Sequence, residues 1–254
     1  MSADRSVHVH LSPLLVPPAR LHGCVAVVID VLRATTTIVH ALAAGCGSVV
    51  PVAEVEEARR LAAGASGEYL LAGERDGLPL PGFDCGNSPG EFTPARCGNK
   101  VLVLTTTNGT RALLHAALAE RVLVGAFVNF SAVCEQLINE PRPIHIVCAG
   151  ESGSVALEDT LLAGAFAGSL GDKGLSPGND GARLALDCFA QHGRNLEQAL
   201  ISGSGGSRLR ALGYDEDIRA AARVDTFALV PELRRDPLRI VVGADRAVPA
   251  HWHA

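Results

Sequence analysis

The sequence predicts an α/β protein with three layers, in which helices cover both faces of a largely parallel or mixed sheet. Strand-like apolar runs alternate along the chain with Ala- and Leu-rich segments of helical spacing. Two strand-to-helix units, at residues 25–42 and 101–118, are similar, which indicates two similar halves and an internal duplication. At 254 residues, with no linker-like run of Ser, Pro or charges, residues 1–254 are predicted to form a single compact domain.

The first half of the chain begins with alternating apolar residues and histidines at 7–11, which predict an edge strand. His8 and His10 then share one face, which is either simply exposed, the simpler interpretation, or binds a metal. The continuous apolar run at 24–31 predicts a buried strand. The other predicted elements are a helix that completes the 25–42 unit, strands at 45–51 and 69–72, and a helix at 52–63.

The second half opens with the unit at 101–118, which predicts a buried strand, a polar loop and a helix. The elements predicted after it are strands at 121–127, 144–148 and 240–243, and helices at 129–138, 157–169, 181–191, 207–212 and 215–222. Residues 202–207 (SGSGGS) predict either a flexible connection or a second small anion loop. His251 and His253 are interpreted as frayed residues, not as ligands.

The longest segment without a regular pattern is residues 73–94 (GERDGLPLPGFDCGNSPGEFTP). Loops of this length in compact domains are usually functional or disordered. Phe83 and Phe92 provide apolar side chains that an ordered loop can bury. We therefore expect an ordered lid or wall of a binding site.

Threonine-rich loops follow the strands of both similar units. The N–H groups at the start of a helix lack intrahelical partners and attract anions. The alternative is that these side chains only cap helices. Ligands of parallel α/β sheets bind beyond the carboxyl ends of strands, so we expect the polar residues there to converge. The residues concerned are Asp30, Arg33, Thr35, Thr36, Thr37, Glu74, Arg75, Thr106, Thr107, Asn108, Gly109, Thr110, Arg111, Glu151, Glu158 and Asp159.

The net charge and the spacing of the cysteines argue against several classes of function. A net charge of -5 with scattered Lys and Arg argues against a nucleic-acid surface and suits a small anionic ligand better. The seven cysteines have no CxxC spacing, so a disulfide framework or structural zinc site is not expected. No signal peptide or membrane-spanning run is predicted. We expect a soluble protein of the cytoplasm.

Several phosphate chemistries are excluded by missing motifs. The chain lacks GxxxxGK[ST], and no GxGxxG follows a strand. A cysteine phosphatase would need arginine where Ser154 follows Cys148, and a DxD phosphatase would need an acid at Leu32. Carboxylates, arginines and hydroxyl-bearing loops remain, which are the components of a magnesium-assisted phosphate site.

Four motifs in the same order resemble the 2-phosphosulfolactate phosphatase family. They are DVLRATTTI from Asp30, GERDGLPLPGFDCGNSPGEF from Gly73, TTTNGT from Thr105 and CAGESGSVALEDTLLAG from Cys148, and the resemblance covers residues 25–231. It implies a three-layer α/β/α fold and Mg²⁺-dependent hydrolysis of 2-phospho-3-sulfolactate to 3-sulfolactate and phosphate, a step associated with coenzyme M biosynthesis. Ala221 departs from the family, whose members often carry cysteine there.

Roles for the candidate residues follow as a hypothesis. Asp30, Glu158 and Asp159 hold Mg²⁺, directly or through water, while Glu74 orients the attacking water. Arg33 and the loop from Thr106 to Thr110 bind the phosphoryl group, with Thr35, Thr36 and Arg111 supplying further donors. Arg75, together with Ser88 or Asn87, binds the rest of the substrate. Nucleophilic attack by Asp30 to form a phosphoenzyme is the alternative mechanism.

Two other functions stay open. One is a phosphatase for another small phosphorylated carboxylic acid, and the other is a non-catalytic protein that binds phosphorylated metabolites. The expected partner in each case is a small anionic phosphorylated molecule. Whether the chain forms a homo-oligomer is also open.

Overall fold

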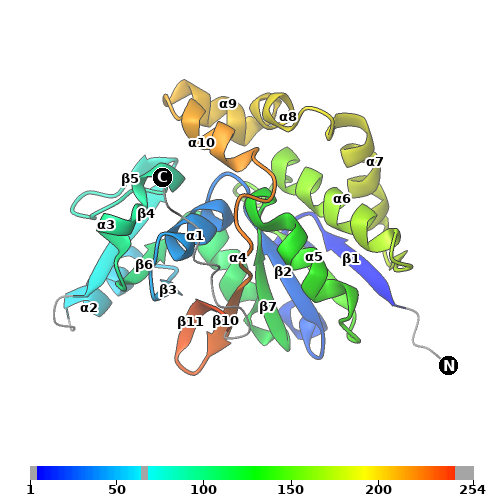
Figure 1. The fold of residues 1–254 in the computed structure, drawn as a ribbon, viewed down its shortest axis with the longest axis horizontal. Coiled ribbons are helices and arrows are strands. Elements are labelled where there is room, and N and C mark those ends of the chain that lie inside the picture. Colours follow the sequence, from blue (N-terminus) through cyan, green and yellow to red (C-terminus); the bar gives the residue numbers. More distant parts are fainter. Residues whose placement is uncertain (1–4, 64–67, 244–254) are drawn as a thin grey trace.

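The computed structural model describes residues 5–63 and 68–243, and within them the chain forms one mixed sheet with helices on both faces (Figure 1). Its 11 strands lie in the order β5-β4-β6-β3-β11-β10-β7-β2-β8-β1-β9. The strands are β1 Ser6–His10, β2 Val25–Ile29, β3 Ser48–Pro51, β4 Tyr69–Arg75, β5 Leu78–Pro79, β6 Val101–Thr105, β7 Arg121–Gly125, β8 Ile144–Cys148, β9 Ser176–Pro177, β10 Pro231–Arg235 and β11 Leu238–Val242. The predicted three-layer α/β class with a mixed sheet is confirmed.

The helices follow the strands in the alternation that the sequence predicts. The α-helices are α1 Ala34–Ala43, α2 Val55–Ala63, α3 Pro94–Cys97, α4 Gly109–His115, α5 Phe130–Ile138, α6 Leu157–Gly171, α7 Asp180–His192, α8 Leu196–Ser202, α9 Ser204–Ala211 and α10 Asp215–Ala221. Short 3₁₀ helices are η1 Pro13–Leu15, η2 Pro18–Leu21, η3 Pro89–Glu91, η4 Ala116–Leu118 and η5 Phe127–Asn129. None of the helices in the described ranges combines the length and apolar character that crossing a bilayer requires.

The sheet consists of two parallel groups joined by an antiparallel hairpin. Strands β7, β2, β8, β1 and β9 pair in parallel, and so do β3, β6 and β4. The hairpin of β10 and β11 lies between them, because β10 pairs with β7 and β11 with β3, both antiparallel. Each group holds one threonine-rich unit, β2 with α1 and β6 with α4. The internal duplication stays a prediction.

Strand β2 shows how the two faces of the sheet are filled. Its residues are all buried, with successive side chains on opposite faces. Val25, Val27 and Ile29 pack into the core that includes α6 and α7. Ala26 and Val28 pack into the second core, which includes α1 and α4. Because helices cover both faces of the sheet at β2, the sequence there is a continuous apolar run, as seen at 24–31.

Several boundaries differ from the predictions. Residues 202–207 are neither a flexible connection nor an anion loop, because α8 ends at Ser202 and α9 begins at Ser204. A Cβ on Gly206 would lie 1.9 Å from the carbonyl oxygen of Leu200, so the glycines permit close helix packing. The sequence reasoning missed α8 and β10, and it placed the start of α9 too late. His251 and His253 lie outside the described residues.

The histidine strand β1 lies next to the edge, since the two-residue β9 pairs with its first half. His145 of β8 stacks on both His8 and His10, with ring centroids 4.7 and 5.2 Å apart. The Nε2 atom of His10 is 3.0 Å from Nδ1 of His145. The histidines are therefore partly buried against one another, and the prediction of a simply exposed face is wrong.

Candidate active site

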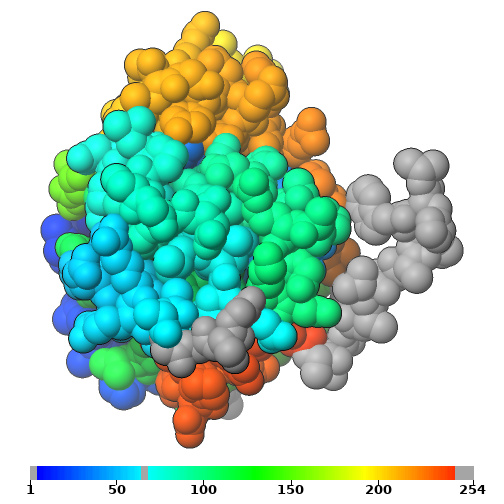
Figure 2. All heavy atoms as spheres, turned by 90° about the vertical axis from the view of Figure 1, so that its left-hand side faces the viewer, coloured from blue at the N-terminus to red at the C-terminus, as the bar shows by residue number. Residues whose placement is uncertain are grey.

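A polar cavity opens beyond the carboxyl ends of β2, β4 and β6. The residues that line it are Asp30, Leu32, Arg33, Glu74, Asp76, Gly77, Asn87, Thr107, Asn108, Ser152, Arg208 and Leu209. Helix α9 contributes the last two, and Figure 2 shows the orange helices lying over the cyan segment near residues 73–94. The predicted convergence at one sheet edge is thus present for Asp30, Arg33, Glu74, Thr107 and Asn108.

Asp30 directly follows β2 and is buried at the cavity wall. Its Oδ1 accepts the Ala34 N–H at 3.2 Å. Burial is the main reason that the pKa of Asp30 rises to about 7. The Ala34 N–H opposes this rise, and the Glu74 and Glu158 carboxylates add to it. A Cβ on Gly109 would lie 2.5 Å from Asp30 Oδ2, so only glycine fits beside this carboxylate.

Glu74, the second-last residue of β4, joins two walls of the cavity. Its Oε1 accepts the Thr107 N–H at 2.8 Å. Its Oε2 accepts the Gly77 N–H at 2.8 Å and the Thr107 hydroxyl at 3.3 Å. A carboxylate has about four acceptor positions. Glu74 therefore positions the Thr107 loop and keeps capacity for one more donor from the cavity.

Asp159, in the first turn of α6, connects the chain after β2 with the chain after β8. Its Oδ1 accepts the Val31 N–H at 2.8 Å, and its Oδ2 accepts the Gly150 N–H at 3.0 Å. Burial, followed by the Asp30 and Glu158 charges, raises the pKa of Asp159 well above its usual value. Because both oxygens have backbone partners, Asp159 holds the loop that presents Asp30.

Glu158, next to Asp159, is buried and has an unpartnered oxygen, Oε2. A Cβ on Gly205 would lie 2.2 Å from its Oε1, so the start of α9 lies directly against the carboxylate. Burial chiefly raises the pKa of Glu158, and the Glu151 charge adds to the rise. A buried carboxylate oxygen without a donor is costly and suits a cation or a bound water.

The threonine hydroxyls mostly hold the loops together. The Thr35 and Thr36 hydroxyls donate to the carbonyl oxygens of Asp30 and Val31, at 2.9 and 2.8 Å. The Thr37 hydroxyl donates to the Asn87 carbonyl at 2.8 Å. In the second loop, Thr106 Oγ1 accepts the Thr110 N–H at 3.1 Å and Thr110 Oγ1 accepts the Thr106 N–H at 3.2 Å. Thr35, Thr36, Thr106 and Thr110 do not line the cavity. The N-cap residues of α1 and α4, Arg33 and Asn108, make no side-chain capping bond, so the capping interpretation is not supported either.

Arg33 lines the cavity, and its guanidinium is held by two partners. Its guanidinium donates to Asp217 Oδ2 at 2.7 Å and to the Gly77 carbonyl at 2.8 Å. The Tyr214 ring lies 4.5 Å from its Cζ. The Ser88 hydroxyl also donates to Asp217. The structure thus places Arg33 and Ser88 in a buried cluster that fastens α10 to the long loop.

The other two predicted arginines lie outside the cavity lining. Arg75 donates to the carbonyl oxygens of Glu74 and Ala53, at 2.7 and 3.1 Å, and to Thr105 Oγ1 at 2.9 Å. Arg111 is exposed and pairs with Glu54 at 3.3 Å. The partners of both arginines therefore lie outside the residues that line the cavity, apart from the Glu74 carbonyl that Arg75 contacts.

Asn87 is the member of the long loop whose placement supports substrate binding most directly. It is 4% exposed, lines the cavity, and its Oδ1 has no hydrogen-bond partner. Residues 73–94 include the short 3₁₀ helix η3, and Phe92 packs into the core.

Sequence reasoning missed several cavity residues. Arg208 immediately follows the SGSGGS stretch, which was the available signal, and Asp76 and Ser152 lie inside the quoted family motifs. Asp217, which binds Arg33, resembles any acid in a first helical turn. Its role depends on where α10 packs, and the local sequence carries no signal for that.

The acids of this site fit a divalent cation, although no three His, Cys, Asp or Glu side chains within the described residues form a ready-made metal group. Asp30 and Glu158 are buried, have raised pKa values and repel each other, and Glu158 keeps a free oxygen. A hard cation with oxygen ligands relieves such repulsion. Asp159 fits a supporting position better than direct ligation, because its oxygens bind backbone N–H groups.

Comparison with known proteins places this chain in one family. Residues 10–236 match the family model described as 2-phosphosulpholactate phosphatase. A protein of Caldanaerobacter subterraneus subsp. tengcongensis named "Probable 2-phosphosulfolactate phosphatase" is 40% identical over 84% of this chain and 89% of its own length. Proteins of the same name from Symbiobacterium thermophilum and a Synechococcus species are each 41% identical, over 85% and 89% of this chain and 94% of their own lengths. The chain belongs to the 2-phosphosulpholactate phosphatase family.

Proposed function

We propose that this protein hydrolyses 2-phospho-3-sulfolactate to 3-sulfolactate and phosphate with the aid of Mg²⁺. The observation that carries the proposal is the buried Asp30 beside Glu74 and Asn87 in a polar cavity, in a chain of this family. Phosphate esters need their developing charge stabilised and an attacking oxygen positioned in line. We place the reaction in the cytoplasm. All seven cysteines are free, which is typical of a reducing compartment and supports this placement.

Asp30 and Glu158 would hold the metal ion, directly or through water. Mg²⁺ in such a site neutralises charge on the phosphoryl oxygens and polarises bound water. Asp159 fixes the backbone on either side of that position through Val31 and Gly150. Asp159, the third acid predicted to hold the metal ion, therefore has a positioning role.

Glu74 would orient the attacking water with its remaining acceptor position. Its bonds to Thr107 and Gly77 keep the carboxylate from rotating, which favours a fixed line of attack. Thr107 and Asn108 would face the phosphoryl group, and the unpartnered Asn87 Oδ1 marks a further polar contact for the substrate or its water.

The alternative mechanism uses Asp30 as a nucleophile that forms a phosphoenzyme. A single turnover quenched with acid separates the two routes, because a phosphoryl group on Asp30 stays on the denatured protein and is released by hydroxylamine. Direct attack by water leaves no phosphoryl group on the protein. Phosphate that is first found on Asp30 would replace the water mechanism with the covalent one.

Phosphate release by purified protein tests the function. We expect release from 2-phospho-3-sulfolactate with Mg²⁺, loss on chelation, and recovery on adding Mg²⁺ back. The panel includes phosphorylated three-carbon acids with and without a sulfonate. Binding without release would identify a non-catalytic binder, and release only from unsulfonated acids would assign a different substrate.

A further inference from the structure

The proposed substrate carries two negative groups besides its phosphate, a carboxylate and a sulfonate. These groups need donors or positive charge of their own within the cavity. Two cations line it among the described residues, Arg33 from the start of α1 and Arg208 from α9. Which of the two is free to bind a ligand follows from their present partners.

Arg33 is not free to change partners. Its side chain is 3% exposed, and the side chain of Asp217, with which it forms an ion pair, is 4% exposed. Leaving that pair would remove the counter-charge of a buried carboxylate, which is strongly destabilising. The Gly77 carbonyl would also lose its donor. Arg33 therefore belongs to the scaffold of the cavity.

Arg208 is in the opposite situation. Its side chain is 41% exposed and its ion pair is with Glu151, whose side chain is 18% exposed. Glu151 has a second partner, because Ser204 donates its hydroxyl to Glu151 Oε2 at 2.6 Å. Partly exposed ion pairs of this kind add little stability. Arg208 can thus leave Glu151 at small cost, and Glu151 keeps a donor when it does.

We propose that Arg208 is a specificity-determining residue that exchanges Glu151 for the non-phosphoryl anionic group of the substrate. This inference rests on the proposed function. The geometry carries it: Arg208 lines the same cavity as Asp30 and Asn87 but reaches it from α9. A planar guanidinium forms paired hydrogen bonds with carboxylates and other oxyanions.

The exchange selects a class of substrate. A phosphate ester with no second negative group cannot compete with Glu151 for the guanidinium and gains nothing from Arg208. An ester with a carboxylate or sulfonate close to the phosphorylated carbon replaces Glu151 and gains a charge-assisted contact. The enzyme would therefore favour small phosphate esters with at least one further anionic group.

Steady-state kinetics of matched variants test the proposal. With 2-phospho-3-sulfolactate, Arg208→Gln should raise KM by about 10- to 100-fold, the size of a lost charged hydrogen bond, with a smaller change in kcat. Arg208→Lys should recover part of the loss. Glu151→Gln should lower KM, because it removes the competitor. Arg210→Gln is the control, since Arg210 lies on the same helix, is 61% exposed and pairs with Asp215 instead.

Two truncated substrates identify the group that Arg208 binds. 2-Phospholactate keeps the carboxylate, and the phosphate ester of 2-hydroxyethanesulfonate keeps the sulfonate. The analogue on which Arg208→Gln still raises KM contains the bound group. If Arg208→Gln changes KM no more than Arg210→Gln does for all three esters, or if Glu151→Gln raises KM, the proposal fails.

Binding of the product separates this inference from the proposed activity. Calorimetry with 3-sulfolactate needs no turnover, and lactate provides the comparison without sulfonate. Loss of 3-sulfolactate binding in Arg208→Gln but not in Arg210→Gln supports the proposal even in a protein that releases no phosphate. Equal binding by both variants contradicts it, whatever the activity of the wild type.

Discussion

Arg33 and Asp217 form a buried ion pair, 2.7 Å between Nη1 and Oδ2, that joins the start of α1 to α10. The Ser88 hydroxyl donates to the same aspartate, so three segments that are distant in the sequence meet at one carboxylate. Arg208 and Leu209 of the neighbouring α9 line the cavity. The pair therefore holds the C-terminal helices over the site.

Asp217→Asn should destabilise the protein strongly, because it leaves the Arg33 charge buried without a counter-charge. The expected loss in the free energy of unfolding is about 3–5 kcal/mol, measured by urea denaturation. Asp215→Asn is the matched control on the same helix, because its pair with Arg210 is exposed, and about 0–1 kcal/mol is expected there. Equal effects of the two variants would show that the buried pair does not fasten α10.

Gly109→Ala should impair activity through Asp30. The new Cβ would lie 2.5 Å from Asp30 Oδ2 and 2.4 Å from the Ala34 Cβ, so the loop or the carboxylate must move. A displacement of this size at a reacting group lowers kcat by about 100-fold. Gly90→Ala is the control, since a Cβ there meets no atom within 4 Å. Wild-type kcat in Gly109→Ala would show that Asp30 tolerates displacement.

The contribution of Asp30 to the stability of the metal-free protein should fall as pH rises from about 4 to about 7. Asp30 has a usual pKa of 3.8 and a pKa of about 7 in the fold, so the folded state binds more protons across that window. Mg²⁺ requires the ionised carboxylate, so its stabilising effect should grow over the same range. Thermal unfolding with and without Mg²⁺, in wild type and Asp30→Asn, measures both effects. An Mg²⁺ shift that is independent of pH, or equal in Asp30→Asn, would separate Asp30 from the metal.

The histidine stack should have the opposite pH dependence. Burial chiefly lowers the pKa of His10 and His145 to about 4, and Arg20 opposes their protonation as well. The folded pKa lies below the usual 6.5, so the stabilisation is complete above pH 6.5 and is lost as pH falls toward 4.

His145→Phe keeps a stacking ring without the titrating group. Its loss of stability between pH 7 and pH 5, measured as the urea midpoint, should be smaller than that of wild type. The exposed His22 provides the control as His22→Phe. If His145→Phe loses as much stability as wild type, the stack is not the source of the acid sensitivity.

Residues at the rim of the cavity could be predicted from the sequence, because a polar residue at the carboxyl end of a parallel strand lies at a known edge of the sheet. Asp30 and Thr107 follow β2 and β6, Glu74 lies at the end of β4, and all three line the cavity. The β10 strand was missed because Glu232, Arg234 and Arg235 give it no apolar pattern.

Partner choice could not be predicted in the same way. A threonine next to a helix start can bind a phosphate or a nearby carbonyl, and the sequence is the same for both; the Thr36 hydroxyl donates to Val31. Arg33 and Arg208 are both arginines beside the site, but one is buried with Asp217 and the other is half-exposed with Glu151. That difference arises from the packing of α9 and α10, which local patterns do not encode.

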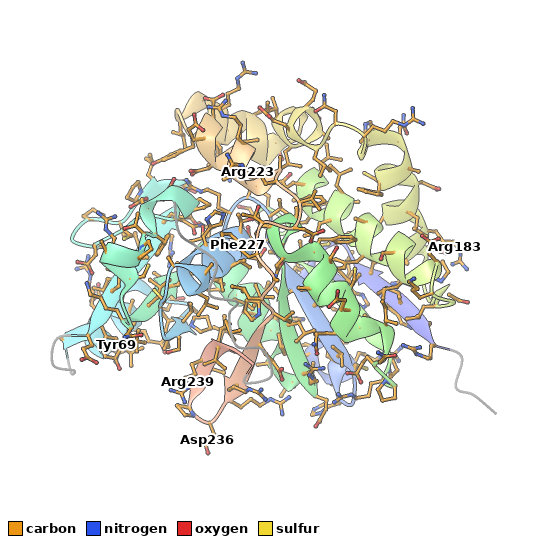
Figure 3. All side chains as sticks on the ribbon, viewed as in Figure 1. Tyr69, Arg183, Arg223, Phe227, Asp236 and Arg239 are labelled. Atoms are coloured by element: carbon orange, nitrogen blue, oxygen red, sulfur yellow. The ribbon has the colours of Figure 1, made fainter. Side chains whose placement is uncertain are left out.

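Phosphate release from 2-phospho-3-sulfolactate by Asp30→Asn is the most direct measurement, with Asp180→Asn as its control. Asp180 is 95% exposed and pairs with Arg183, which points away from the body of the molecule (Figure 3). We expect Asp30→Asn to lower kcat by about 100- to 1,000-fold while the protein stays folded, and Asp180→Asn to match wild type. Folded Asp30→Asn protein with wild-type turnover would contradict the assignment of this cavity as the active site.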